Sequence, residues 1–206
     1  MVININNMNL EIIGLYGTNY LNQFHVRQMA KLIRKSHVAL LPHLKEFEKN
    51  KILVSKKIGK SRVYSLNLNN NQGREFLSSA EKKKSLDLLN KEILIKKIYD
   101  EFIKLDLSGS LVLFGSFASK THTEESDIDL LYLGDSREAQ IKEIKDIGKI
   151  YNKEIHLVSM TLKQFREQLT KQGALTKEII SNHIILYNHD LFVNEIWRYY
   201  EGKKEG

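Results

Sequence analysis

The sequence predicts two modules, a helical module that ends in a β-hairpin and, after it, a small α/β domain. Apolar residues recur at helical spacing between residues 8 and 49 and then alternate up to residue 66. Further along, two apolar runs within 111–133 flank a polar loop, and helical and strand patterns follow them. We therefore divide the 206 residues into 1–70, a connecting helix at 71–105, and 106–206.

Three helices are expected in the first module. The first spans residues 8–17 and stops at Gly17, and the second spans 26–35. Ser36 is a candidate N-cap for the third, at 38–49. Pro42 falls inside this third helix, where it removes an amide donor and favours a kink.

A hairpin follows, because Ile52-Leu-Val54 and Val63-Tyr-Ser-Leu66 flank a turn at Ile58-Gly-Lys60. With three preceding helices, this order resembles a winged helix-turn-helix over residues 8–68. The stretch from His43 to Leu53 is similar to the end of its recognition helix, and Lys57 to Leu66 is similar to its wing. The resemblance implies a module that binds nucleic acid or docks a protein.

Charge favours the nucleic-acid alternative. Residues 1–105 hold 19 Lys and Arg against 9 Asp and Glu, a net +10, whereas residues 106–206 carry −3. Residues 49–74 carry seven basic side chains and no acidic one, and such a wing would neutralise phosphates. Protein docking stays open, since Pro42 stands where the family often has a base-contacting residue. The candidate nucleic-acid contacts are Ser36, His43, Lys45, Lys56, Lys57, Lys60 and Arg62.

Between the modules, the segment 67–73 is rich in asparagine and reads as a linker. A helical pattern from Arg74 to Leu105 follows, in which Lys82-Lys-Lys84 marks a break or an exposed face.

The segment 111–133 carries the chemistry. An apolar strand ends in Gly115-Ser116, and the next strand begins with Ser126-Asp127-Ile-Asp129. Alternate residues of a strand share one face, so the two carboxylates lie side by side and require a neutralising cation. Oxygen ligands with an open shell suit Mg²⁺. The Gly-Ser turn allows close backbone approach and offers donors to a phosphate.

This pattern resembles the signature of the nucleotidyltransferase superfamily that includes DNA polymerase beta, and it is most similar to the minimal nucleotidyltransferases of prokaryotes. The resemblance implies an α/β (α+β) fold with a small mixed sheet. It implies that Asp127 and Asp129 hold Mg²⁺, which binds the triphosphate of an NTP, with ATP as first choice. Gly115, Ser116 and Ser126 would contact the nucleotide, and pyrophosphate would leave in line.

Two departures from the family pattern stand out. The family has a basic residue and then glycine where Ser119 and Lys120 stand, so Lys120 supplies the charge one place later or the loop is altered. The third carboxylate of the family is replaced by His156, within Glu154-Ile-His-Leu-Val158. His156 is a poor Mg²⁺ ligand but a possible base. Glu154 is two residues earlier on the same face and could substitute; alternatively, the site binds nucleotide without efficient transfer.

The remaining sequence features exclude several kinds of site and predict the other helices and strands of the second module. Without cysteine there is no disulfide scaffold, thiolate zinc site or cysteine nucleophile. The absence of a long apolar run or basic leader predicts no membrane span and no signal peptide, so we expect a cytoplasmic protein. Trp197, Tyr199 and Tyr200 are expected in the core or in a homodimer contact. Helices are expected at 137–150, 162–170, 174–181 and 190–200, and a strand at 184–187.

Two functions fit these observations. The first is an Mg²⁺-dependent nucleotidyltransferase that moves a nucleoside monophosphate from an NTP to a nucleic-acid or protein acceptor, with a winged helix for targeting. The second is a DNA-binding regulator or antitoxin-like protein whose nucleotidyltransferase domain only binds nucleotide or is inactive.

Overall fold

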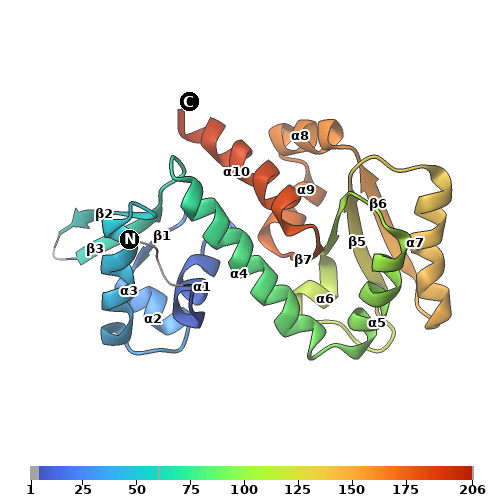
Figure 1. The fold of residues 1–206 in the computed structure, drawn as a ribbon, viewed down its shortest axis with the longest axis horizontal. Coiled ribbons are helices and arrows are strands. Elements are labelled where there is room, and N and C mark those ends of the chain that lie inside the picture. Colours follow the sequence, from blue (N-terminus) through green and yellow to red (C-terminus); the bar gives the residue numbers. More distant parts are fainter. Residues whose placement is uncertain (1–4, 60, 206) are drawn as a thin grey trace. The chain divides into compact units, whose positions relative to one another are not determined.

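The chain folds into two compact units in the computed structural model, which describes residues 5–59 and 61–205 (Figure 1). One unit comprises Met1–Ala80 with Tyr200–Gly206, and the other comprises Glu81–Tyr199. The division between the units falls inside helix α4 (Asn71–Leu89), ten residues beyond the expected end of the first module at residue 70.

The first unit combines three helices with a three-stranded antiparallel sheet of order β1-β3-β2. Ser36 caps α3 as expected, since its hydroxyl accepts the Ala39 amide at 3.2 Å. Pro42 lies inside α3 without ending it. The elements are α1 (Asn7–Gly14), β1 (Gln23–His25), α2 (Val26–Leu32), α3 (His37–Lys49), β2 (Leu53–Ile58) and β3 (Ser61–Leu66).

Tyr16 anchors the core of this unit. Its side chain is fully buried, its hydroxyl donates to the Tyr64 carbonyl at 3.0 Å, and its ring meets Phe24 edge to face. Phe24 belongs to β1, a strand of three residues that the sequence pattern did not predict. The strand forms because β3 offers it a partner, with Phe24 opposite Tyr64.

The asparagine-rich segment is a turn tied to the end of α3. The side-chain amides of Asn67 and Asn70 both donate to the carbonyl of Lys51, at 2.7 and 2.9 Å. The Asn70 oxygen also accepts the amide of Gln72. Helix α4 begins at Asn71, at the expected start of the connecting segment and three residues before the helical pattern that begins at Arg74.

The expected helix at 74–105 is two helices. Helix α4 runs through Lys82–Lys84 unbroken, and α5 (Ile93–Phe102) begins after a turn at Asn90–Glu92. Within the turn, the amides of Lys91 and Glu92 donate to the Leu88 carbonyl at 2.8 Å, which closes the end of α4. A short 3-10 turn, η1 (Ile103–Leu105), completes the segment.

The second unit is built on a four-stranded mixed sheet of order β6-β5-β4-β7. Strand β4 (Ser110–Leu113) is antiparallel to β5 (Ile128–Leu133) and to β7 (Ile184–Tyr187), while β5 and β6 (Ile155–Met160) are parallel. Helix α7 (Glu138–Ile150) provides the crossover between the two parallel strands. The remaining helices are α6 (Gly115–Ser119), α8 (Leu162–Lys171), α9 (Ala174–Ser181) and α10 (His189–Glu205).

The core of this unit lies between the sheet and helices α5 and α7. Ile128, Leu130 and Tyr132 of β5 belong to it, together with Ile144 and Ile147 of α7. The intervening residues of β5 therefore point to the opposite face of the sheet, and Asp129 is one of them. Trp197 is buried in α10, which places it in the core. Within residues 5–59 and 61–205, no helix is both long and apolar enough to cross a membrane.

Candidate functional site

Two residues at the start of β5 and two at the start of β6 converge at one end of the second unit's sheet. Asp129 lies opposite His156 in the parallel register, and Asp127 precedes β5 as Glu154 precedes β6. The amide of Ile128 donates to the carbonyl of Glu154 at 3.0 Å, and this bond fixes the register in which β5 and β6 begin. All four side chains therefore emerge on the same face of the sheet.

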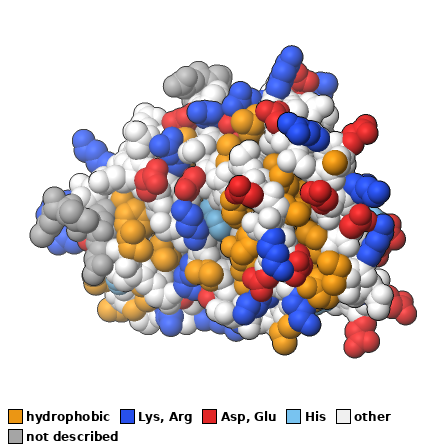
Figure 2. Space-filling view, turned by 45° about the vertical axis from the view of Figure 1, so that its right-hand side comes forward, with side chains coloured by type: hydrophobic (Ala, Val, Ile, Leu, Met, Phe, Trp, Pro, Cys, Tyr) orange, Lys and Arg blue, Asp and Glu red, His pale blue; other side chains and the backbone are white. Residues whose placement is uncertain are grey.

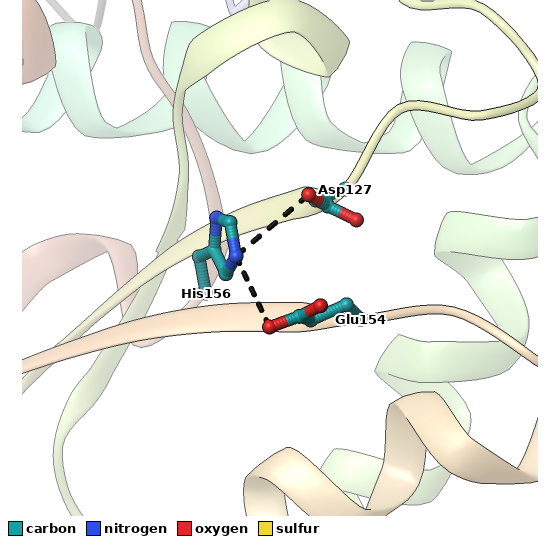
Figure 3. A group of neighbouring side chains, drawn as sticks. All are labelled: Asp127, Glu154 and His156. Atoms are coloured by element: carbon teal, nitrogen blue, oxygen red, sulfur yellow. Dashed lines mark ion pairs between the residues drawn. The ribbon is translucent and has the colours of Figure 1, made fainter.

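His156 is the centre of this cluster (Figure 3). Its Nε2 lies 3.3 Å from Glu154 Oε1 and 3.7 Å from Asp127 Oδ2, and its Nδ1 lies 3.6 Å from Asp129 Oδ1. The cluster is open to solvent, because the exposed fractions are 53% for His156, 44% for Asp127 and 29% for Asp129. A protonated His156 would neutralise carboxylates that a cation would otherwise neutralise.

The donors suit a divalent cation. One ligand atom each from Asp127, Glu154 and His156 can be chosen so that all three lie within 4.8 Å of one another. Adding Asp129, three of the four side chains offer carboxylate oxygens, the ligands that Mg²⁺ takes, and solvent access leaves positions for other oxygens. The residues present therefore fit a hard divalent cation.

Gly115 is required where it stands. Its φ is +65°, and a Cβ built on it would lie 2.1 Å from Asp129 Oδ2. The preceding amide, that of Phe114, donates to the Asp129 carbonyl at 3.0 Å. The Gly-Ser turn thus passes directly against the Asp129 carboxylate, an approach that a residue with a Cβ could not make.

The short helix α6, which begins at this turn, is closed by local hydrogen bonds. The Ser119 hydroxyl contacts the carbonyls of Gly115 and Ser116 and the hydroxyl of Thr121. Lys120 follows in the left-handed region with φ 61°, and its side chain is exposed. Among described residues it makes no ion pair, so Lys120 is positioned near the turn but is not fixed against it.

Ser126 has a structural contact in the same loop. Its hydroxyl accepts the Thr123 amide at 2.9 Å and lies 3.3 Å from the Thr123 hydroxyl. These bonds close a turn directly before Asp127. The structure therefore places Ser126 beside the cluster and engages its hydroxyl within the turn.

Three supporting residues escaped the sequence analysis. Lys153 donates from Nζ to the carbonyls of Glu124 and Ser126, and so ties the loop before Asp127 to the start of β6. His122 stacks on Phe117 with ring centroids 4.1 Å apart. The partners of Lys153 are main-chain carbonyls distant in sequence, which leave no residue pattern to recognise.

Asn182 is the third. Its side-chain amide donates to the carbonyl of Gly115 at 3.5 Å, so the turn between α9 and β7 contacts the Gly-Ser turn. The next residue, His183, is buried, and desolvation lowers its pKa so that the ring stays neutral. Lys84 Nζ donates to the His183 carbonyl and thereby fixes this turn to α4.

The nucleic-acid candidates of the first unit have mixed environments. Lys45, Lys56 and Lys57 are exposed. In contrast, His43 Nδ1 lies 2.6 Å from the Asn9 side chain, and Arg62 pairs with Glu48 at 3.1 Å.

Ser36 is occupied in capping α3, and Lys60 lies outside the described residues. Among the candidates that the structure describes, Lys45, Lys56 and Lys57 make no ion pair with another described residue.

One family of known proteins matches the part of the chain that carries this site. Residues 95–187 match the family described as nucleotidyltransferase domain, a range that contains the Gly-Ser turn and all four residues of the cluster. No curated protein gives a significant match. A solved structure described as the crystal structure of a toxin-antitoxin with AMP-PNP covers 52% of this chain and 92% of its own, at 15% identity and a TM-score of 0.32.

Proposed function

We propose that this protein is an Mg²⁺-dependent nucleotidyltransferase that moves a nucleoside monophosphate from an NTP, with ATP as the first choice, to an acceptor hydroxyl. One observation carries the proposal. The cluster of Asp127, Asp129, Glu154 and His156 lies against a glycine turn inside the segment that matches the nucleotidyltransferase domain.

Each residue is assigned a role. Asp127 and Asp129, with Glu154 as third carboxylate, would hold the cation, which when bound neutralises the triphosphate. Gly115 and Ser116 would contact the phosphates, and Asn182 would hold that turn in place. Lys120 would supply positive charge beside it, and Ser126 would shape the loop that presents Asp127.

The transfer step balances as a substitution at phosphorus. The acceptor oxygen forms a bond to the α-phosphorus, the bond from that phosphorus to the bridging oxygen breaks, and pyrophosphate leaves with the electron pair. The acceptor proton passes to His156 in its neutral form or to water. His156 lies 3.3–3.7 Å from the three carboxylates of the cluster, so it is placed beside the proposed cation site.

The experiment is a transfer assay with α-labelled NTP and Mg²⁺ on protein and nucleic-acid acceptors. Label should appear on an acceptor with the wild type and be lost in Asp127→Asn with Asp129→Asn. Asp135→Asn is a matched control, because this exposed aspartate lies beyond the other end of β5. Transfer that persists in the double variant would refute the assignment.

A second function is favoured by the position of His156. When protonated, this side chain pairs with Asp127, Asp129 and Glu154 and competes with a cation for them. In that form the domain would bind nucleotide without transfer, as in a DNA-binding regulator or an antitoxin-like protein. Nucleotide binding with no labelled acceptor from any source would favour this function.

We also propose that the first unit is a winged helix that targets the protein to nucleic acid. Exposed Lys56 and Lys57 on β2 and Lys45 on α3 support the proposal. Replacing Lys56 and Lys57 by alanine should reduce the slope of log affinity against log salt concentration, for DNA or RNA binding, by about one to two. An unchanged slope would instead leave protein docking or homodimer formation as the role of this unit.

A further inference from the structure

A groove opens beside the cluster, between α7 and strand β6. It has a volume of about 840 Å³, and residues 152–158 line it without interruption. Glu154 and His156 are part of this lining, so the groove leads to the proposed site of transfer. The opposite wall consists of Lys142, Lys145, Asp146 and Lys149.

The floor of the groove is an open sheet edge. Strand β6 is the outermost strand of the sheet and pairs, among the described residues, with β5 alone. The carbonyls of Glu154 and Met160 both accept from the β5 side, so the even-numbered residues of β6 face β5. The alternation of parallel pairing then leaves the amides and carbonyls of Ile155, Leu157 and Ser159 directed to the open side.

The wall of the groove is basic. Lys142, Lys145 and Lys149 lie on one side of α7 and are all exposed. Lys149 pairs with Asp146 at 2.5 Å, while Lys142 and Lys145 make no ion pair with any residue in the described ranges. Figure 2 turns this side of the second unit forward and shows apolar side chains exposed among charged ones. The groove therefore suits an anionic and partly apolar occupant.

We propose that this groove docks an extended acidic polypeptide segment of the acceptor, which adds to β6 as a further strand. Such a segment satisfies both the amides and the carbonyls of the open edge and places carboxylates against Lys142 and Lys145. A nucleic-acid backbone offers phosphate acceptors for the amides but no regular row of donors for the carbonyls. A second copy of this chain would bring the same lysines together, which repel.

The inference rests on the proposed function only for what happens after docking. A serine, threonine or tyrosine of the docked segment, or of the protein that carries it, would then reach Asp127 and Asp129. Its hydroxyl oxygen replaces the pyrophosphate oxygen on the α-phosphorus, and the proton passes to neutral His156 or to water. Docking by itself requires neither NTP nor the carboxylates.

The test measures docking without NTP on the full-length chain. The probe is a fluorescent peptide long enough to cover β6, with glutamate at every second position, and its binding is followed by anisotropy. Two control peptides are compared with it. In the first, every glutamate is replaced by glutamine; in the second, every second backbone nitrogen, on one edge of the peptide strand, is methylated. Each change should weaken binding about tenfold or more, the first by loss of charge and the second by loss of strand pairing.

Variants of the protein locate the site. Lys142→Glu with Lys145→Glu should weaken binding about tenfold, whereas Lys163→Glu with Lys177→Glu, which reverses two exposed lysines on α8 and α9, should leave it unchanged. Equal binding of the methylated peptide would overturn strand addition. Tighter binding of an oligothymidylate of matched charge, lost in the same α7 variant, would show a nucleic-acid groove instead.

The two proposals fail separately. Asp127→Asn with Asp129→Asn should abolish transfer and leave peptide binding intact. Peptide binding by a protein that transfers nothing would overturn the proposed function alone. Transfer to a protein acceptor that is insensitive to the α7 charge reversal would overturn the docking proposal alone.

Discussion

Replacing Gly115 by alanine should disrupt the cluster while the fold remains. The new Cβ would lie 2.1 Å from Asp129 Oδ2, whereas ordinary contact begins at 3.4 Å, so the carboxylate or the turn must move by roughly 1.3 Å. A displacement of about 1 Å can cost about 100-fold in rate, and a disturbed ligand environment costs about 10–100-fold in metal affinity. We therefore expect Mn²⁺ to bind Gly115→Ala at least about tenfold more weakly, which relaxation or paramagnetic resonance measures.

Gly59→Ala provides the matched control. Gly59 has φ +58°, close to that of Gly115, but its added Cβ would meet no atom within 4 Å. Both variants carry the left-handed strain of about 1–2 kcal/mol in the free energy of unfolding. Only Gly115→Ala should lose Mn²⁺ affinity. Equal Mn²⁺ binding by wild type and Gly115→Ala would refute the reasoning that the turn and Asp129 share one site.

Two further predictions concern the cluster and its support, and a third concerns a partly buried histidine in α10. His156→Asp adds a carboxylate ligand and should strengthen Mn²⁺ binding about tenfold, whereas His156→Asn should not. Mn²⁺ titrations of the two variants measure this, and equal gains in affinity would contradict the prediction. Lys153→Ala should speed amide exchange of residues 121–127, whereas Lys149→Ala should not, and equal exchange in both would contradict the tie to the loop carbonyls. Burial lowers the pKa of His189 to about 4 from an unfolded value of about 6.5, so unfolding takes up a proton in this range. The free energy of unfolding, measured by urea denaturation, should therefore fall as pH falls from about 6.5 to about 4, and His189→Asn should flatten this fall.

The local order of the site was predictable from sequence. Asp127 and Asp129 share a face because strands alternate, and Gly115 follows closely after the end of the neighbouring strand β4. For the same reason Glu154 was expected on the face of His156, and the structure brings both to Asp127. What the pattern could not give is the strand order, since the pairing of β5 with β6 and of β4 with β7 depends on contacts across the whole unit.

The errors in the fold have local physical reasons. The break at Asn90–Glu92 was missed because apolar residues on either side keep helical spacing. The lysine triplet that was considered as a break lies within continuous α4. Strand β1 was missed because three residues are too few to show alternation.

The contacts in the first unit were equally beyond sequence reasoning. His43 was expected at a nucleic-acid surface, and the structure engages it with Asn9, a residue 34 positions earlier. Glu48 stands just before the acid-free stretch, and from α3 it pairs with Arg62 of β3. Both pairings follow from how α3 packs against α1 and β3, which residue spacing does not encode.

The most direct test of the central claim uses ATP labelled at either the α- or the γ-phosphate, with Mg²⁺ and a cell extract as the source of acceptor. The account predicts that α-label becomes covalently attached to a macromolecule while γ-label is released as pyrophosphate in equal amount. It also predicts that both signals disappear in Asp127→Asn with Asp129→Asn. Attachment of the γ-label, or release of inorganic phosphate in place of pyrophosphate, would contradict nucleotidyl transfer at this cluster.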